Sequence, residues 1–196
     1  LRGTADWLAP PGVICLENTH NRCGGAVIPV EDFAAVAAVA ARHRVAVHLD
    51  GARLFNAAVA AGVPVTAWTR HATSVQFCLS KGLSAPIGSV VVGPKPFIAR
   101  ARRSRKLLGG GMRQVGVLAA PGLLALRDGP AGMIERLQED HDNAKRLAEG
   151  LAAEAMRAVG MDHKSHARPS AMSGGERQLV GLARVLACDP HLILAD

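Results

Sequence analysis

Short runs of β-branched residues alternate with alanine-rich stretches along most of this chain, and this alternation restricts its possible folds more than any other feature. The short runs have the length of buried strands, whereas the alanine-rich stretches are long enough for helices. Such alternation is typical of βαβ units around a mostly parallel sheet. We therefore predict an α/β fold, with a mostly parallel sheet flanked by helices. The predicted strands cover residues 13–16, 45–49, 74–79 and 88–92, and the predicted helices cover 32–44, 52–61, 94–105, a segment from about 112, and 133–156.

Composition excludes several classes of protein. Of the 196 residues, 49% are hydrophobic, which is enough for a folded core and argues against a disordered chain. The longest apolar stretch, residues 115–126, contains Pro121 and is too short to cross a bilayer, so we predict no membrane insertion. Because the sequence begins at Leu1 without a methionine, we expect a fragment of a longer protein.

The cysteines show no pattern of a disulfide framework or a metal site. Cys15, Cys23, Cys78 and Cys188 are widely spaced, and none has a histidine at the spacing of zinc ligands. We therefore expect reduced cysteines, a cytoplasmic location and no metal.

The net charge of +7 is concentrated in one segment. Its basic residues are Arg100, Arg102, Arg103, Arg105 and Lys106, with Arg113 just beyond. A solvated helix surface is the favoured interpretation, and a small phosphate or carboxylate site comes second. Nucleic acid binding is the least favoured, because no aromatic side chains that could stack on bases lie between the charges.

Polar side chains follow three of the predicted strands, where ligands bind in parallel α/β sheets. Among them are Asp50, Arg53 and Lys81, which supply a carboxylate, a guanidinium and an amine. Pyridoxal phosphate (PLP) enzymes need an amine that bonds to the cofactor and a carboxylate that keeps its ring nitrogen protonated. An arginine can hold a substrate carboxylate with two parallel hydrogen bonds. Each residue also has a simpler interpretation, since a lysine before glycine is commonly a solvated loop residue and Asp-Gly is commonly a turn.

Four motifs, in order, resemble those of the threonine aldolases over about residues 13–152. They are LENTHN at 16–21, HLDGAR at 48–53, LSKGL at 79–83 and GGGMRQ at 109–114. This resemblance implies part of the large domain of the aspartate aminotransferase-like enzymes, which are PLP-dependent and of fold type I. It also implies that Lys81 is the catalytic lysine that carries PLP as a Schiff base, that Asp50 is the partner of the ring nitrogen and that Arg53 binds the substrate carboxylate. The other residues implied to lie near the cofactor are Ser80, Asn18, His20, Lys106 and Arg113.

The reaction implied by the resemblance is cleavage of L-threonine or L-allo-threonine to glycine and an aldehyde, in a homo-oligomer. Lys106 and Arg113 would bind the cofactor phosphate, in some cases across a subunit interface. His20 either orients the cofactor and transfers a proton or is a hydrogen-bonded residue at a strand end, and Asn18 is either a cofactor partner or a turn former. The family's phosphate loop and stacking histidine normally precede the first motif, so both would lie before Leu1.

Residues 154–196 differ in character and resemble an ABC transporter ATP-binding subunit. The matching residues are Ser173, Gly174, Gly175 and Glu176, which resemble the signature loop, and Asp196, which ends a segment similar to the Walker B strand. No glycine-rich phosphate loop occurs in the sequence, so a complete nucleotide site is not predicted and a capped helix followed by a strand is the simpler interpretation. We predict a lyase-like domain at 1–153 and a foreign tail at 154–196, joined inside one helix. The leading hypothesis is a PLP-dependent lyase, and the alternatives are an ABC subunit fragment and a non-catalytic chimeric fragment.

Overall fold

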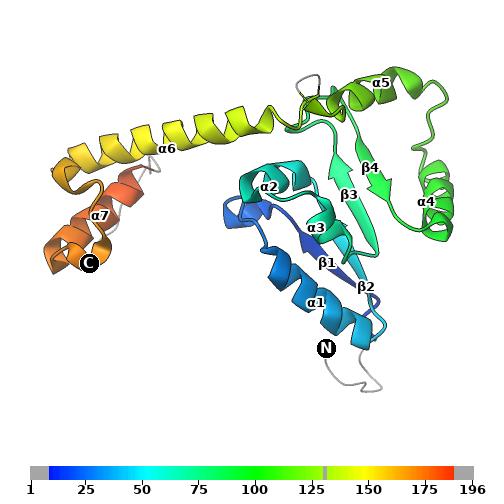
Figure 1. Cartoon of the computed structure of the whole chain (residues 1–196), viewed down its shortest axis with the longest axis horizontal. Coiled ribbons are helices and arrows are strands. Elements are labelled where there is room, and N and C mark those ends of the chain that lie inside the picture. Colours follow the sequence, from blue (N-terminus) through cyan, green and yellow to red (C-terminus); the bar gives the residue numbers. More distant parts are fainter. Residues whose placement is uncertain (1–8, 130–131, 188–196) are drawn as a thin grey trace. The chain divides into compact units, whose positions relative to one another are not determined.

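The computed structural model of the chain describes residues 9–129 and 132–187 (Figure 1), which form two compact units. The units divide between Gln138 and Glu139, and we refer to them as the sheet unit and the C-terminal unit. The predicted join at residues 153 and 154 stays a prediction and falls within a single helix, α6 (Leu137–Ala158). The boundary between the two compact units lies 15 residues before this predicted join (153 minus 138).

The sheet unit is built on four strands in the order β1-β2-β3-β4, shown side by side in Figure 1. The strands are β1 (Val13–Glu17), β2 (Ala46–Asp50), β3 (Ser74–Cys78) and β4 (Ser89–Val92). The first three are mutually parallel, and β4 is antiparallel to β3. The predicted mostly parallel α/β sheet is confirmed. Because β1, β2 and β3 are parallel, their carboxyl ends lie at one edge of the sheet, and the residues after them are brought together there.

One core cluster packs against the first part of the sheet. The helices are α1 (Val30–Arg42), α2 (Leu54–Ala61) and α3 (Thr66–Thr69). Phe33, Leu49 and Trp68 are fully buried in this cluster. Helix α3 was not predicted, because four residues are too short to show the helical spacing of apolar side chains. It is nevertheless important, because it carries the largest buried side chain of the unit.

A second core cluster lies beneath the loop that follows β3. Its buried members are Leu79, Leu83, Ala85, Ala125 and Leu137. The remaining helices of the unit are α4 (Lys95–Leu107) and α5 (Gly116–Ala125), so the helix expected from about residue 112 begins a turn later. This cluster fixes the backbone on both sides of Lys81.

The C-terminal unit contains most of α6 together with α7 (Gly174–Leu186) and two short 3-10 turns, η3 (Asp162–Lys164) and η4 (Pro169–Ala171). Its core cluster consists of Ala155, Met156, Met161 and Ala183, with Val159 and Val180 at its border. The predicted amphipathic helix is confirmed, but its apolar face is covered only in part: Leu147 is 65% exposed and Leu151 is 46% exposed. No helix in the described part of the chain is long and apolar enough to cross a membrane.

Candidate active site

Backbone hydrogen bonds extend the sheet past the ends of its strands and set the turns that carry polar side chains. Glu17 and Asp50 face each other in the β1–β2 register, and the amide of Asn18 donates to the carbonyl of Asp50 at 2.9 Å. The amide of Gly51 donates to the carbonyl of Gln76 at 2.7 Å. A Cβ atom at position 51 would lie 2.9 Å from that same carbonyl oxygen, so this close approach requires glycine.

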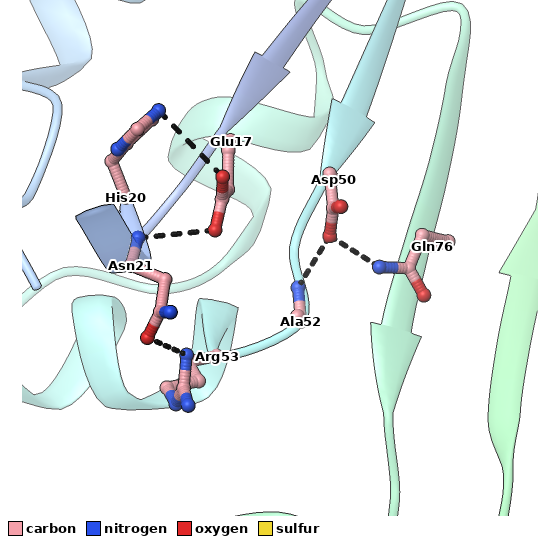
Figure 2. Close-up of polar contacts among 7 residues, drawn as sticks. All are labelled: Glu17, His20, Asn21, Asp50, Ala52, Arg53 and Gln76. Atoms are coloured by element: carbon pink, nitrogen blue, oxygen red, sulfur yellow. Dashed lines mark hydrogen bonds and ion pairs between the residues drawn. The ribbon is translucent and has the colours of Figure 1, made fainter.

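Asp50 is held by one carboxylate oxygen only (Figure 2). Its Oδ1 accepts hydrogen bonds from the backbone amide of Ala52, at 3.1 Å, and from Nε2 of Gln76 on the neighbouring strand. No described residue donates a hydrogen bond to Oδ2. The side chain is therefore oriented by its neighbours while one oxygen is left to interact with a bound group.

Arg53, at the start of α2, is joined to the loop after β1. Its Nη1 donates to Oδ1 of Asn21 at 3.2 Å, as Figure 2 shows. The backbone amide of Asn21 donates to Oε1 of Glu17 at 3.0 Å, and Oε2 of Glu17 lies 3.7 Å from Nε2 of His20. Residues of β1, its following turn and α2 thus form one connected polar group.

Two buried polar atoms in the turn after β1 have no hydrogen-bond partner among the described residues: Nδ2 of Asn18 and Nδ1 of His20. Asn18 is fully buried, and its Oδ1 accepts from the amide of Ile28 at 3.2 Å. The carbonyl of Ile28 in turn accepts from Nε1 of Trp68 at 2.9 Å. Leaving a buried donor without a partner costs free energy, so these two atoms are where a bound ligand would gain most from a hydrogen bond.

Lys81 lies in a tight loop after β3, the strand next to that of Asp50. The amide of Leu79 donates to the carbonyl of Gly88 at 2.9 Å, and the amide of Ala85 donates to the carbonyl of Leu79 at 3.0 Å. Leu79 and Leu83 are buried, whereas Ser80 and Lys81 are exposed between them. The amine of Lys81 has no hydrogen bond or ion pair with any described residue. The apolar anchors therefore fix the loop and leave the amine available.

Lys106 and Arg113, which the resemblance implies as phosphate ligands, lie at the end of α4 and in the loop beyond it. Both are exposed, and in the described ranges no hydrogen bond or ion pair joins either to the residues around Asp50. Arg100, Arg102, Arg103 and Arg105 are exposed as well, and α4 contains no acidic residue. The exposure agrees with the predicted solvated helix surface, and the role of Lys106 and Arg113 stays a prediction.

Comparison with known proteins shows which family the chain belongs to. The beta-eliminating lyase family model matches residues 1–167. The chain belongs to the beta-eliminating lyase family. Over 139 residues it is 55% identical to low-specificity L-threonine aldolase 1 of Arabidopsis thaliana, covering 71% of this chain and 38% of that protein. It is 48% identical to the low specificity L-threonine aldolase of Escherichia coli strain K12, covering 71% of this chain and 40% of that protein.

This member of the beta-eliminating lyase family thus spans about two fifths of the length of these relatives. A solved structure from Listeria monocytogenes EGD-E, provisionally named an L-allo-threonine aldolase, superimposes with a TM-score of 0.62 at 16% identity. That match covers 94% of this chain and 63% of the other. At this identity the likeness concerns the fold, and it agrees with the predicted fold type I architecture.

The structure adds three residues to the candidate site that the sequence did not single out: Glu17, Asn21 and Gln76. The strand-end pattern indicates residues that contact a ligand directly, whereas these three contact other site residues. Gln76 carried a signal, because it is a polar residue within the apolar run Ser74–Cys78. Asn21 and Glu17 belong to a recognised motif, but nothing in it indicates a bond to Arg53, which is 32 residues away.

The residues that resemble an ABC signature loop form the start of α7. Ser173 caps this helix: its Oγ accepts from the amide of Glu176 at 3.2 Å, and its amide donates to Oε2 of Glu176 at 2.6 Å. The amide of Ser173 is the main cause of a lowered pKa for the Glu176 carboxyl, and Lys164, 3.4 Å away, contributes less. Gly174 and Gly175 open the helix, whereas Asp196 lies outside the described residues. The capped-helix part of the prediction is confirmed, and the ABC resemblance stays a prediction.

Proposed function

We propose that this chain carries part of the active site of a PLP-dependent carbon–carbon lyase. Its substrates would be L-threonine or L-allo-threonine, which it would cleave to glycine and an aldehyde. The observation that supports this most is the Asp50 carboxylate, which is held through Oδ1 and whose Oδ2 bonds to no described residue. It lies at the sheet edge where the Lys81 loop also begins. The names of the relatives, which are L-threonine aldolases, support the same reaction.

The residues present fit PLP. Lys81 offers an amine with no partner among the described residues, Asp50 offers an oxygen to the ring nitrogen, and Asn18 and His20 offer buried atoms that lack partners in the same part of the chain. Ser80 is exposed beside Lys81, and Lys106 and Arg113 are the candidate phosphate ligands. When bound, the cofactor supplies an acceptor for the electron pair released as the substrate's Cα–Cβ bond breaks.

Three of these site residues then have definite tasks. Asp50 keeps a proton on the ring nitrogen, which makes the ring a better electron acceptor. Arg53 binds the substrate carboxylate through its remaining guanidinium donors. A base must remove the proton of the β-hydroxyl group, and His20 is the candidate because its buried Nδ1 has no partner among the described residues.

The decisive experiment mixes the purified chain with PLP, records the visible absorbance spectrum and then adds borohydride. We expect a visible band that borohydride bleaches, with the cofactor mass fixed to Lys81 in peptide mass spectrometry. Lys81→Ala should abolish the band and glycine release from threonine, whereas Lys95→Ala, at an exposed position on α4, should leave both unchanged. No band, or a band that survives Lys81→Ala, would refute the proposed function.

The proposal includes a cytoplasmic homo-oligomer. Assembly is supported by exposed apolar side chains from the end of α4 to the end of α5, among them Leu107 at 76%, Leu108 at 86% and Leu123 at 71% exposure. A group of this kind on a soluble protein commonly marks a protein–protein interface. Sedimentation velocity of the native chain and of a Leu108→Ser, Leu123→Ser double variant would test assembly, and a monomer in both cases would contradict it.

For the C-terminal unit, a piece of an ABC transporter ATP-binding subunit is the second candidate. The start of α7 at Gly174, immediately after Ser173, is the observation that favours it, because a helix N-terminus is where that family's signature loop meets phosphate. Against it, the hydroxyl of Ser173 is already used in the helix cap. Equilibrium dialysis with ATP tests this candidate. ATP retained by the native chain but not by Ser173→Ala would support a nucleotide site, and no retention by the native chain would refute it.

A further inference from the structure

We propose that Asn21 is a positioning residue for Arg53, and that Glu17 holds Asn21 in place. The inference rests on the proposed function in one respect, the assignment of Arg53 as the ligand of the substrate carboxylate. Its structural basis is the 3.2 Å hydrogen bond from Nη1 of Arg53 to Oδ1 of Asn21 (Figure 2). This bond joins the loop after β1 to the start of α2.

The chemistry of the partner matters. A guanidinium has five N–H donors in a planar fork, so one bond to an amide oxygen restricts its orientation and leaves other donors for a carboxylate. Asn21 is uncharged, and in the described part of the chain no carboxylate forms an ion pair with Arg53. An acidic partner would neutralise the guanidinium and compete with the substrate. An amide orients the arginine without that competition.

Glu17 links this contact to the sheet. It is the last residue of β1 and stands opposite Asp50 in the strand register. Its Oε1 accepts from the amide of Asn21 at 3.0 Å, which fixes the start of the 3-10 turn η1 (Asn21–Cys23). Its Oε2 lies 3.7 Å from Nε2 of His20. The Glu17 carboxylate therefore connects both Asn21 and His20, the candidate base, to β1, the strand next to that of Asp50.

The first test needs no cofactor. In the nitrogen-15 NMR spectrum of the unloaded chain, the Nε–Hε signal of Arg53 is assigned by its loss in Arg53→Lys. We expect Asn21→Ala to shift this signal and to speed its exchange with water, because the guanidinium loses its partner. Arg22→Ala, at an exposed position in the same turn, is the matched control and should leave the signal unchanged. An unchanged signal in Asn21→Ala overturns the inference, whether or not PLP binds.

Variants of Glu17 extend this test. Glu17→Ala should reproduce the change in the Arg53 signal, because the amide of Asn21 loses its acceptor. Glu17→Gln should change it less, since a carboxamide oxygen can still accept from that amide. Equal changes in Glu17→Ala and Glu17→Gln would overturn the part assigned to Glu17.

The second test uses the PLP-loaded chain and threonine. We expect Asn21→Ala to raise KM about three- to tenfold with a smaller change in kcat, because a carboxylate contact serves ground state and transition state alike. Asn21→Asp should raise KM as well, since the new carboxylate would form an ion pair with the Arg53 guanidinium and compete with the substrate carboxylate. A fall in kcat with KM unchanged would overturn the inference. If the native chain shows no Lys81-dependent absorbance band with PLP, the proposed function is refuted. The NMR signal of Arg53 would still decide the role of Asn21.

Discussion

The sheet unit and the C-terminal unit place their polar side chains by contacts of very different sequence separation. In the sheet unit, Asn21 contacts Arg53 32 residues away, and Asp50 contacts Gln76 26 residues away. In the C-terminal unit, Ser173 and Glu176 bond to each other across three residues. A local motif needs only its own helix, whereas the candidate active site exists only once three parallel strands are in register.

The two units also differ in the size of the side chains that form their cores. The sheet unit buries the large side chains of Trp68, Phe33 and Leu49 completely. The core cluster of the C-terminal unit contains two alanines, two methionines and no aromatic side chain, and an alanine buries less apolar area than a tryptophan, phenylalanine or leucine. We therefore expect the candidate site to depend on a long-range core and the α7 cap to depend on local bonds.

The largest expected effect is that of Trp68→Ala. Removing this fully buried ring should lower the free energy of unfolding of the sheet unit by about 3–5 kcal/mol. It also removes the indole donor to Ile28, whose amide bonds to Asn18, so the candidate site should lose its geometry. Urea unfolding followed by circular dichroism measures the loss.

Hydrogen exchange of the Glu176 amide sharpens the comparison in the same Trp68→Ala sample. Its partner is Ser173, three residues away, so its protection should persist. If protection at Glu176 fell together with that of the strands, the contrast between long-range and local placement would be wrong.

Next in size is Gly51→Ala. The added Cβ would lie 2.9 Å from the Gln76 carbonyl oxygen and 2.9 Å from Cβ of Leu54, so the backbone beside Asp50 must shift. We expect a loss of about 1–3 kcal/mol in unfolding free energy, together with weaker PLP binding. Gly181→Ala in α7 is the control: a Cβ there meets nothing within 4 Å, and the helix should gain about 0.5–1 kcal/mol. Equal effects at the two positions would remove the distinction.

A smaller effect is expected of Ser173→Ala, which removes the cap of α7. The loss should be about 1 kcal/mol and confined to the C-terminal unit. Hydrogen exchange of α7 amides would report it, while the Lys81-dependent absorbance band should be unaffected. A weaker band in this variant would show that the cap and the candidate site are coupled.

The smallest expected effect is a pH dependence of α7. The pKa of Glu176 is lowered from its ordinary value of 4.5, chiefly by the amide of Ser173, so the folded state binds a proton less readily than the unfolded state. The stabilisation is therefore present in full above pH 4.5 and is lost as the pH falls through the lower folded-state pKa. Protection factors of α7 amides, which compare the measured exchange rate with the intrinsic rate at each pH, should fall in the native chain as the pH falls through this range. Glu176→Gln should flatten that dependence, and an unchanged slope would contradict the assignment.

Several elements could be predicted from the sequence because their signals are local. The four strands and most of the helices follow from runs of apolar residues, and the cap of α7 follows from a serine three residues before a glutamate. The strand-end residues Asp50, Arg53 and Lys81 could also be selected, because polar side chains after strands are conspicuous. The four-residue helix α3 and the antiparallel direction of β4 lacked such signals.

The sequence by itself determined which residues could do chemistry, and the tertiary structure decided which of them touch. Asp50, Arg53 and Lys81 are recognisable as types at positions, since a strand followed by a polar residue is a local pattern. The hydrogen bonds from Gln76 to Asp50 and from Arg53 to Asn21 depend on strand register and on the placement of α2. Register is set by packing of the whole buried face, so no local stretch of sequence contains it.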